Sequence, residues 1–489
     1  MSAARSDDAP VPFHHTAEPP SPFARRILLV SPHFPPSTTV GGLRWQKMSQ
    51  VAAEWGWGTD VVCNDPATLD DTDVARLRDL PPGMRLFGVP HSRAVGLRAL
   101  DALLRVTRGL RVPARPRGRA VGAAAGAMPD GARAPGGGTP GSVARDEARR
   151  LRLSSRELFR NVTSLQWIGG ELRWASTATA LGSRLLDARH HVVVSSGPPH
   201  FAHVAARRIA RRARLPHVVD MRDPWLLGER VAVGLASPTY FRVTEQFERR
   251  VMDDAALIVC NTELAARAMR AAYPRRADRI VTVMNGSDAE DRPSVARDPR
   301  FLVAYTGAIY FDRDPRLLFR ASAQVIAELG LTPAEFGLEL MGPVDVLSPP
   351  VVALAQQEGV EPFVRYHPPG PRSAAARLLA SASLLVSLPQ DTETAVPSKV
   401  FEYATYDAWL LALARRDSAT ALVLEGSSAD VVAPDDVAGI AQVIRRHVLQ
   451  YRNGERPVAV GADGRFSRRR QAVTLLEHVD RLTAISRES

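Results

Sequence analysis

The chain has 489 residues, of which 45% are hydrophobic, and carries a formal net charge of +11 at pH 7. This length exceeds what one hydrophobic core usually fills, so we expect two domains. The two cysteines, Cys63 and Cys260, lie in apolar strand-like runs, which excludes a disulfide framework or a cysteine-based zinc site. The sequence shows neither a signal peptide nor the ~18 unbroken apolar residues of a membrane-spanning helix. We therefore expect a cytoplasmic protein.

The positive charge predicts an acidic partner, which could be nucleic acid, an anionic membrane surface or a phosphorylated ligand. Aromatic residues make up 6% of the chain and do not interleave with the arginine runs, and no zinc-finger spacing is present. These features exclude the usual platforms for reading nucleic acid, so we expect no nucleic-acid partner. The arginines of residues 207–214 are typical of a solvated helix face. Peripheral contact with the anionic inner face of a membrane stays open.

Apolar runs in the first part of the chain predict alternating strands and helices. Residues 27–30 predict a strand, GGLRWQKMSQVAAEWGWG a helix that ends at glycine, and TDVVC the next strand, which together form one βαβ unit. Residues 113–148 contain few bulky apolar side chains and much Gly, Pro, Ala and Arg, which predicts a disordered insertion. The alternation then resumes with HVVVSS, AHVAARRIARRA, HVVDM, EQFERRVMDD, ALIVC and IVTVM.

A second alternating set begins near residue 300 and includes the strand-like runs FLVAYT, FGLELM, FVRYH, SLLVSL and WLLALA. We therefore expect an α/β protein with two Rossmann-like parallel-sheet domains that face each other across a cleft. Ligands should bind at the carboxyl ends of the strands. The expected divisions are a disordered tail over 1–23, a first domain over 24–295 that holds the insertion, a second domain over 296–462, and a C-terminal helix over 463–489 that packs on the first domain.

Candidate binding residues follow the predicted strands of the first domain. Gly41 and Gly42 open a helix, where backbone without side chains lets N–H groups approach an anion, although a plain turn fits the same pattern. His200 follows the SSGPP turn and is a candidate base, an acceptor-binding group or a polar loop residue. Two acids around an arginine at another strand end favour a binding site. This last group comprises Asp220, Arg222 and Asp223.

A short helix is predicted after Pro397, where apolar residues at 400, 401, 403 and 404 form one stripe. Glu402 points away from that stripe. Two interpretations are open: a solvated acid that favours the helix dipole, or a carboxylate that contacts a ligand.

Taken together, these segments resemble the motif series of family 4 retaining glycosyltransferases with the GT-B architecture, in a subgroup with a PSKxFEY-type motif. The likeness runs from residue 25 to residue 485 apart from the insertion, and the motifs occur in the order of the family. The matching stretches are ILLVSPHFPP (27–36), Gly41 and Gly42 with Arg44, SSGPP (195–199), DMRDPW (220–225), NGSD (285–288), YTG (305–307) and PSKVFEY (397–403).

The resemblance implies that Glu402 hydrogen-bonds the ribose of a nucleotide sugar and that the start of its helix meets the donor diphosphate. It implies no cofactor and no obligatory metal ion, since the nucleotide-diphosphate sugar is a co-substrate. The donor-binding residues that it implies are Gly41, Gly42, Gly307, Arg316, Pro397, Ser398, Lys399, Val400 and Glu402. The residues expected on the acceptor side are His33, Asp220, Arg222 and Asp223.

The chain departs from the family pattern at three places. The Glu-x7-Glu pair of the family requires an acid at position 394, where Thr394 stands, with Glu393 one residue earlier. The basic pair that follows the YTG strand is absent from its usual place, and Arg313 and Arg316 are the nearest cations. The family histidine corresponds to the SSGPP turn, which leaves His200 as a displaced candidate. Our hypothesis for the catalytic group is His200, Arg313 and Thr394.

The resulting hypothesis is a retaining, metal-independent hexosyltransferase that acts in polysaccharide, glycolipid or other glycoconjugate biosynthesis. The basic surface favours a lipid-linked or otherwise anionic acceptor. One alternative is a non-catalytic GT-B binding or partner protein, which Thr394 and the missing basic pair favour. Another is a non-hydrolysing nucleotide-sugar epimerase, which should carry more acids and histidines at the sugar end.

Overall fold

A computed structural model describes residues 13–19, 23–91, 155–227, 237–288, 292–309, 313–344, 349–388 and 394–488. The predicted insertion at 113–148 lies outside the described residues, as does most of the predicted tail. The described residues divide into two compact units. The smaller unit comprises residues 155–173 and 237–246, and the larger unit comprises the rest and contains two β-sheets.

The first sheet has eight strands in the order β1-β4-β3-β2-β5-β6-β7-β8. All neighbouring strands are parallel except β1, which runs antiparallel to β4 at the edge. The connections change direction at β2, so the loops after β2 and β5 lie where open α/β sheets bind ligands. The strands are β1 (His14–Thr16), β2 (Arg25–Val30), β3 (Trp57–Asn64), β4 (Arg85–Val89), β5 (His190–Gly197), β6 (His217–Met221), β7 (Leu257–Cys260) and β8 (Ile280–Thr282).

The second sheet has six parallel strands in the order β11-β10-β9-β12-β13-β14. Its switch point lies between β9 and β12, so the loops after these two strands are the expected ligand-binding loops. The strands are β9 (Phe301–Thr306), β10 (Phe336–Met341), β11 (Val364–His367), β12 (Leu384–Ser387), β13 (Trp409–Leu413) and β14 (Asp430–Val432).

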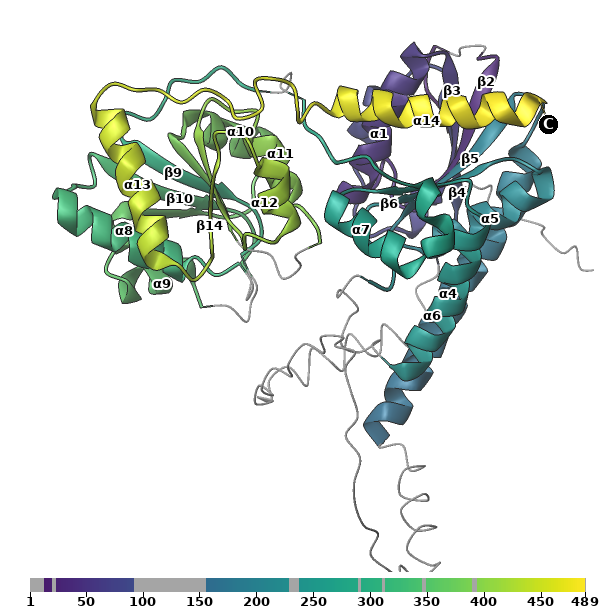
Figure 1. The fold of residues 1–489 in the computed structure, drawn as a ribbon, viewed down its shortest axis with the longest axis horizontal. Helices are drawn as coiled ribbons and strands as arrows, with labels where there is room; N and C mark the ends of the chain where they lie inside the picture. Colours follow the sequence, from purple (N-terminus) through teal and green to yellow (C-terminus); the bar gives the residue numbers. More distant parts are fainter. Residues whose placement is uncertain are drawn as a thin grey trace, which may run out of the picture. The chain divides into compact units, whose positions relative to one another are not determined.

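Helices cover both faces of the first sheet (Figure 1). Ile27 and Leu29 of β2 face a core that α1 and α14 complete, whereas Leu28 faces Gly182 of α4 and Ile209 of α5. Because both faces are covered, the central strands are continuous apolar runs. The helices are α1 (Leu43–Glu54), α4 (Ser155–Leu185), α5 (Phe201–Ala213), α6 (Pro238–Asp254), α7 (Glu263–Ala272) and α14 (Arg468–Glu488), and the 3-10 turns are η1 (Val40–Gly42), η2 (Pro66–Thr68), η3 (Val74–Asp79) and η4 (Pro274–Arg279).

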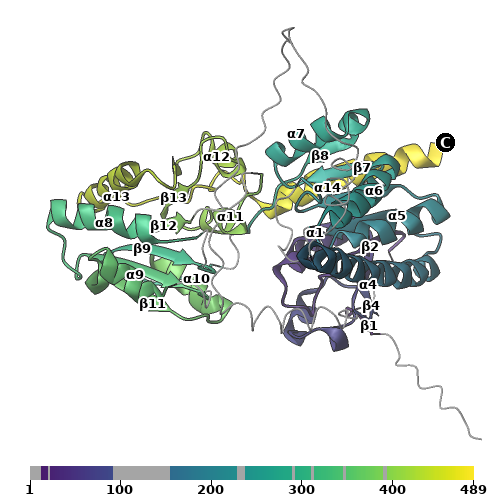
Figure 2. The ribbon, with the colours of Figure 1, turned by 90° about the horizontal axis from the view of Figure 1, so that it is seen from below.

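The second sheet is also covered on both faces (Figure 2). Val303 of β9 faces the core that α8, α9 and α13 complete, and its neighbours Leu302 and Ala304 face α10, α11 and α12. The helices are α8 (Arg316–Leu329), α9 (Val351–Gln357), α10 (Arg372–Ser381), α11 (Ser398–Tyr403), α12 (Ala419–Leu424) and α13 (Val437–Arg452), with the 3-10 turn η6 (Glu361–Phe363).

The predicted α/β class and the two parallel-sheet Rossmann-like domains are confirmed. One part of the predicted tail is wrong, because residues 14–16 form β1 and His14 stacks on Phe87 of β4 at 4.8 Å between ring centroids. The run HHT carries no apolar signal, and its strand conformation depends on the edge of β4. None of the described helices combines the length and hydrophobicity needed to cross a membrane.

Candidate functional site

Arg222 and Gly41 meet at the carboxyl end of the first sheet. Arg222 follows β6 and donates from Nε to the Gly197 carbonyl at 3.2 Å and from Nη2 to the Pro198 carbonyl. A Cβ on Gly41 would lie 2.1 Å from Nη1 of Arg222, so the close approach of this guanidinium requires glycine. Burial lowers the pKa of Arg222, although the carboxylates of Asp220 and, to a smaller extent, Asp223 oppose this effect. Gly41, predicted to bind the donor, and Arg222, predicted on the acceptor side, therefore lie together.

Two histidines complete this group. His33 follows β2, and His200 is the N-cap residue of α5, where it stacks on Trp225 with ring centroids 5.3 Å apart. Burial, with Arg222 as the second cause, lowers the pKa of His33 to about 4 and that of His200 to about 3. The Nδ1 atoms of both rings are buried and have no hydrogen-bond partner among the described residues. Both rings are therefore neutral near pH 7. A Cβ on Gly42 would lie 3.0 Å from the His33 carbonyl oxygen.

Asp220 is fully buried, and its carboxylate is bonded within the protein. Its carboxylate accepts hydrogen bonds from Nε of Arg44 at 3.2 and 3.1 Å, from Nε1 of Trp45 at 2.7 Å and from Oγ of Ser196 at 3.1 Å. These bonds hold the start of α1 against β5 and β6. The predicted acceptor-side role of Asp220 is therefore corrected to a structural one. The error arose because a position at a strand end does not tell which face its side chain takes.

Lys399 and Gly307 form the corresponding group at the second sheet. Gly307 follows β9 with φ of +151°, and a Cβ there would lie 2.5 Å from Cε of Lys399. Nζ of Lys399 donates to Oγ1 of Thr306 at 3.5 Å. Burial lowers the pKa of Lys399, while Glu402 opposes this effect and Arg313 adds to it. The Lys399 ammonium therefore lies within electrostatic reach of both Glu402 and Arg313.

The buried side chain of Tyr403 connects the two elements that carry Gly307 and Lys399. The Tyr403 hydroxyl accepts a hydrogen bond from the Thr306 amide at 2.8 Å and donates to the Thr306 carbonyl at 3.0 Å. The end of β9 is therefore joined to α11. Sequence reasoning did not assign Thr306 or Tyr403 to the site, although both stand within the YTG and PSKVFEY stretches. The sequence feature that could have revealed them is a tyrosine on the buried stripe of a helix, because a buried hydroxyl requires a hydrogen-bond partner.

The start of α11 differs from the prediction. Pro397 is the N-cap residue and has no N–H, and the Val400 amide already donates to the Pro397 carbonyl at 3.0 Å. The Val400 side chain is fully buried. A helix of six residues also has a small dipole, so the predicted diphosphate contact here depends on Ser398, which is exposed, and on the charge of Lys399.

Glu402 is half-buried and faces a hollow at the surface. Thr394 is half-buried in the segment before α11, and Glu393, the other candidate for the first acid of the pair, lies outside the described residues. The residues of the second sheet and its helices that line the hollow are Arg372, Ser373, Ala376, Glu402, Thr405 and Tyr406.

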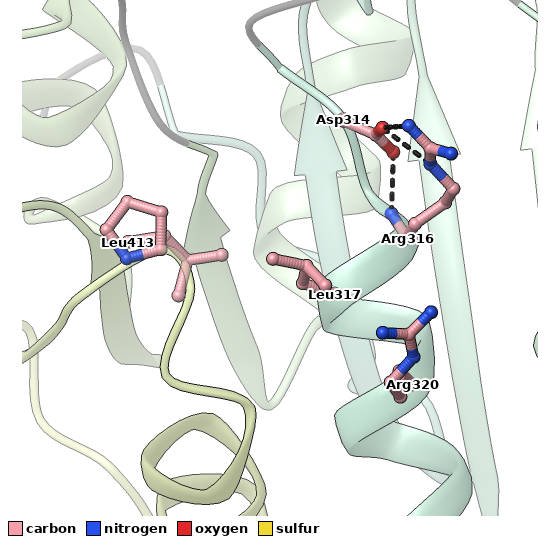
Figure 3. Close-up of a pocket in the computed structure, with 6 residues that line it drawn as sticks. Asp314, Arg316, Leu317, Arg320 and Leu413 are labelled. Carbon is pink, nitrogen blue, oxygen red and sulfur yellow. Dashed lines mark hydrogen bonds and ion pairs between the residues drawn. The ribbon is translucent and has the colours of Figure 1, made fainter.

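Arg313 and Arg316 have different surroundings. Besides burial, the positive charge of Arg313 helps to lower the pKa of Lys399. Arg316, in contrast, begins α8 and donates from Nε to Oδ2 of Asp314 at 2.6 Å. Figure 3 shows this ion pair beside a cavity of about 370 Å³ between α8 and the end of β13, with Leu317 and Leu413 across from each other. The electrostatic influence of Arg313 on Lys399 therefore distinguishes it from Arg316.

Metal-ligating side chains do not gather in the described part of the chain, where no three His, Cys, Asp or Glu residues could hold one ion. The positive charges of the site come from arginine and lysine side chains.

Comparisons with known proteins place the chain in a family. A sequence profile described as "Glycosyl transferase 4-like domain" matches residues 41–286, just over half of the chain. None of the curated proteins matches the chain.

Solved structures give the same fold at low sequence identity. Sucrose-phosphate synthase from Thermosynechococcus elongatus aligns with a TM-score of 0.57 and 12% identity over 94% of this chain and 100% of that chain. A UDP-forming α,α-trehalose-phosphate synthase from Burkholderia xenovorans aligns with a TM-score of 0.51 and 14% identity over 92% and 94%. TarM aligns with a TM-score of 0.55 and 9% identity over 94% and 98%. The architecture is GT-B, and the chain belongs to the glycosyl transferase 4-like domain family.

Proposed function

We propose that this chain is a retaining glycosyltransferase whose donor is a nucleotide-diphosphate sugar. The observation that carries the proposal is the group at the end of β9, where Lys399 lies against Gly307 and within electrostatic reach of Glu402 and Arg313. A half-buried lysine with a lowered pKa gains from a polyanionic ligand, because the ligand stabilises the charge that burial disfavours. Family membership supplies the reaction class.

In this proposal Lys399 and Arg313 bind the donor diphosphate and stabilise the negative charge that develops as it leaves. Gly307 supports the site by leaving space for the lysine side chain. Glu402 accepts hydrogen bonds from two ribose hydroxyls, which a carboxylate does well. Its position on α11, three residues after Lys399, suits a nucleotide whose ribose lies next to the diphosphate.

The chemical step exchanges one bond at the anomeric carbon. The bond from that carbon to the diphosphate oxygen breaks, a bond to the acceptor oxygen forms on the same face, and the acceptor proton passes to the departing phosphate. His200 is a poor base for this proton, because its pKa is lowered to about 3. We assign it a neutral hydrogen-bonding role toward the sugar or acceptor. The acceptor is proposed to be lipid-linked or otherwise anionic, with Arg222 as its cationic partner.

Donor binding is the first test. Calorimetry and thermal shift with a panel of nucleoside diphosphates and nucleotide sugars should identify one nucleotide whose binding is lost in Glu402→Ala. The matched control is Glu425→Ala, which removes an exposed carboxylate from the end of α12 and should bind normally. If no nucleotide binds the unaltered chain, the donor assignment is wrong.

Assays of sugar transfer test the role of His200 and the proposed independence from a metal ion. His200→Ala should slow transfer, and normal turnover in that variant would remove His200 from the mechanism. Activity should survive EDTA, whereas recovery only on addition of a divalent cation would contradict the metal-independent form of the proposal.

A non-catalytic binding protein is the second candidate, and Thr394 at the position of the first family acid favours it. Tight nucleotide binding without transfer to any acceptor would support this candidate. Production of an altered free nucleotide sugar without acceptor would instead indicate an epimerase.

A further inference from the structure

The net charge of the chain resides in two sequence segments that contain the smaller compact unit, although most of their arginines lie outside the described residues of that unit. Residues 92–173 and 230–246 contain 18 arginines, no lysine and seven acidic residues, so their formal net charge of +11 equals that of the whole chain. The remaining sequence is neutral overall. Positive charge that is concentrated in this part of the sequence favours an anionic partner.

The described part of this unit also exposes large apolar side chains. Phe159, Val162 and Leu165 recur every three residues along α4 and are 48%, 45% and 51% exposed, and Phe241 on α6 is 42% exposed. Ten large apolar side chains are exposed among the described residues, and four of them lie in this small unit. Such clustering marks an interaction surface, whereas single exposed apolar residues do not.

The opposite side of α4 is already packed. Oγ of Ser164 lies 2.9 Å from Oγ of Ser237, just before α6, and the rings of Trp167 and Tyr240 lie 5.8 Å apart. Ile168 is buried on the same side. The exposed stripe is therefore not needed to hold the two helices together.

Exposed arginines stand next to the apolar side chains. Arg160 follows Phe159 on α4, and Arg242 follows Phe241 on α6. An amphipathic surface of this kind suits a bilayer interface, where aromatic and aliphatic groups enter the headgroup region and guanidinium groups bind lipid phosphates. Single-stranded nucleic acid fits less well, because Val162 and Leu165 offer no ring for base stacking.

We propose that Phe159, Val162, Leu165 and Phe241, together with Arg160 and Arg242, form a docking surface for an anionic phospholipid bilayer. This inference does not rest on the proposed transferase chemistry, because vesicle binding requires no turnover. It gives the chain a place at a membrane without a spanning helix.

Co-sedimentation of the full chain with vesicles tests the proposal. The chain should bind phosphatidylcholine vesicles that contain phosphatidylglycerol, bind pure phosphatidylcholine weakly, and lose affinity at high salt. Replacing both Arg160 and Arg242 by Gln should weaken binding about fivefold per arginine. Arg212→Gln with Arg416→Gln removes two exposed arginines elsewhere and should have a smaller effect.

A second set of variants tests the contribution of the apolar side chains to vesicle binding. Phe159→Ser, Val162→Ser and Leu165→Ser together should weaken vesicle binding on the order of tenfold or more, because their burial at the interface is lost. The matched control replaces three exposed apolar residues of the second sheet region, Val352, Leu449 and Val458, by Ser and should bind normally. Equal binding by both triple variants would overturn the proposal. Binding that depends on the arginines alone would assign the surface to a soluble polyanion and would overturn it too.

A fluorophore at Val162→Cys provides a readout that does not depend on removal of the patch. Both native cysteines are buried, and burial raises the pKa of each thiol to about 12, so labelling near neutral pH is selective for the new residue. Brominated anionic lipid should quench the label at position 162 and leave a label at Val458→Cys unquenched. Equal quenching, or none, contradicts the docking surface.

Discussion

The polar groups at the carboxyl ends of the two sheets differ in how much of their bonding capacity the protein uses for itself. At the first sheet, Asp220 accepts bonds from three side chains, and Arg222 donates to two backbone carbonyls. At the second sheet, Lys399 makes one long contact of 3.5 Å to Thr306 among the described residues. Asp220 and Arg222 are therefore held by bonds within the protein, whereas Lys399 has little bonding within the described residues, as the proposed diphosphate site requires.

This difference predicts different consequences of mutation. Changes at the first sheet should lower the free energy of unfolding, because they leave buried charged groups without partners. Changes at the second sheet should lower ligand binding and leave the fold intact.

The largest expected effect is on Asp220. Asp220→Ala leaves the buried guanidinium of Arg44 without its carboxylate and should lower the free energy of unfolding by about 4 kcal/mol. Urea denaturation at pH 7 measures this change. Asp223→Ala at the same strand end removes a half-buried acid and should cost less than about 1 kcal/mol. Similar losses in the two variants would show that Asp220 is not the structural partner that its contacts indicate.

The next largest effect is expected at low pH, which should destabilise the first sheet more than the second. Burial lowers the pKa of His200 and of His217 to about 3 each, and both histidines belong to the first sheet region. Because their pKa values are depressed in the folded state, their neutral forms are favoured above pH 6.5, and that stability is lost as the pH falls from 6.5 toward 3. The loss is about 1 kcal/mol per pH unit for the buried His217 and smaller for His200, which is half-buried.

Hydrogen exchange at pH 6.5 and pH 4.5 tests this expectation by region. Amides of β5 and β6 should lose protection at the lower pH, and those of β9 and β12 should change less. His217→Gln should flatten the pH dependence of the first sheet, whereas an unchanged slope would assign the acid sensitivity to other groups.

Substitution of Lys399 should affect activity and not stability, in contrast to substitution of Asp220. Lys399→Ala removes a cation from the proposed diphosphate site and should lower turnover about 100-fold. The melting temperature should not fall, because burial of the ammonium is unfavourable. Lys399→Arg should restore part of the diphosphate affinity, which a purely structural role for the lysine would not allow.

The sheets could be predicted from sequence because their strands are covered on both faces. Runs such as ILLV and FLVAYT stay apolar at every position, and each run proved to be a strand with residues in two cores. β1 and α4 were missed for a physical reason. The strand His14–Thr16 depends on the edge of β4. The periodic signal of α4 is weak because apolar residues such as Phe159 and Val162 are exposed while polar residues such as Thr163 are buried.

The position of the candidate site could be predicted from the sequence, but the direction of its side chains could not. Strand ends and family motifs pointed to Gly41, Arg222, Gly307 and Lys399, and the structure brings Gly41 to Arg222 and Gly307 to Lys399. The prediction had instead assigned Gly41 to the donor-binding group with Gly307 and Lys399. Side-chain direction within a strand end could not be predicted in the same way. Asp220 turned inward to bonds with helix α1, which only the tertiary structure reveals.

The smallest effect is expected at Arg316, which separates the two arginines that sequence could not distinguish. Its charge is paired with Asp314, and the pair is exposed beside α8, so Arg316→Ala should leave donor affinity within about twofold of the unaltered chain. Arg313→Ala should weaken diphosphate binding on the order of tenfold or more, because its charge reaches Lys399. Titration of the same nucleoside diphosphate into both variants makes the comparison. If Arg316→Ala were the weaker binder, the diphosphate would have to lie against α8 rather than at the end of β9, and the grouping of Lys399 with Gly307 would lose its functional meaning.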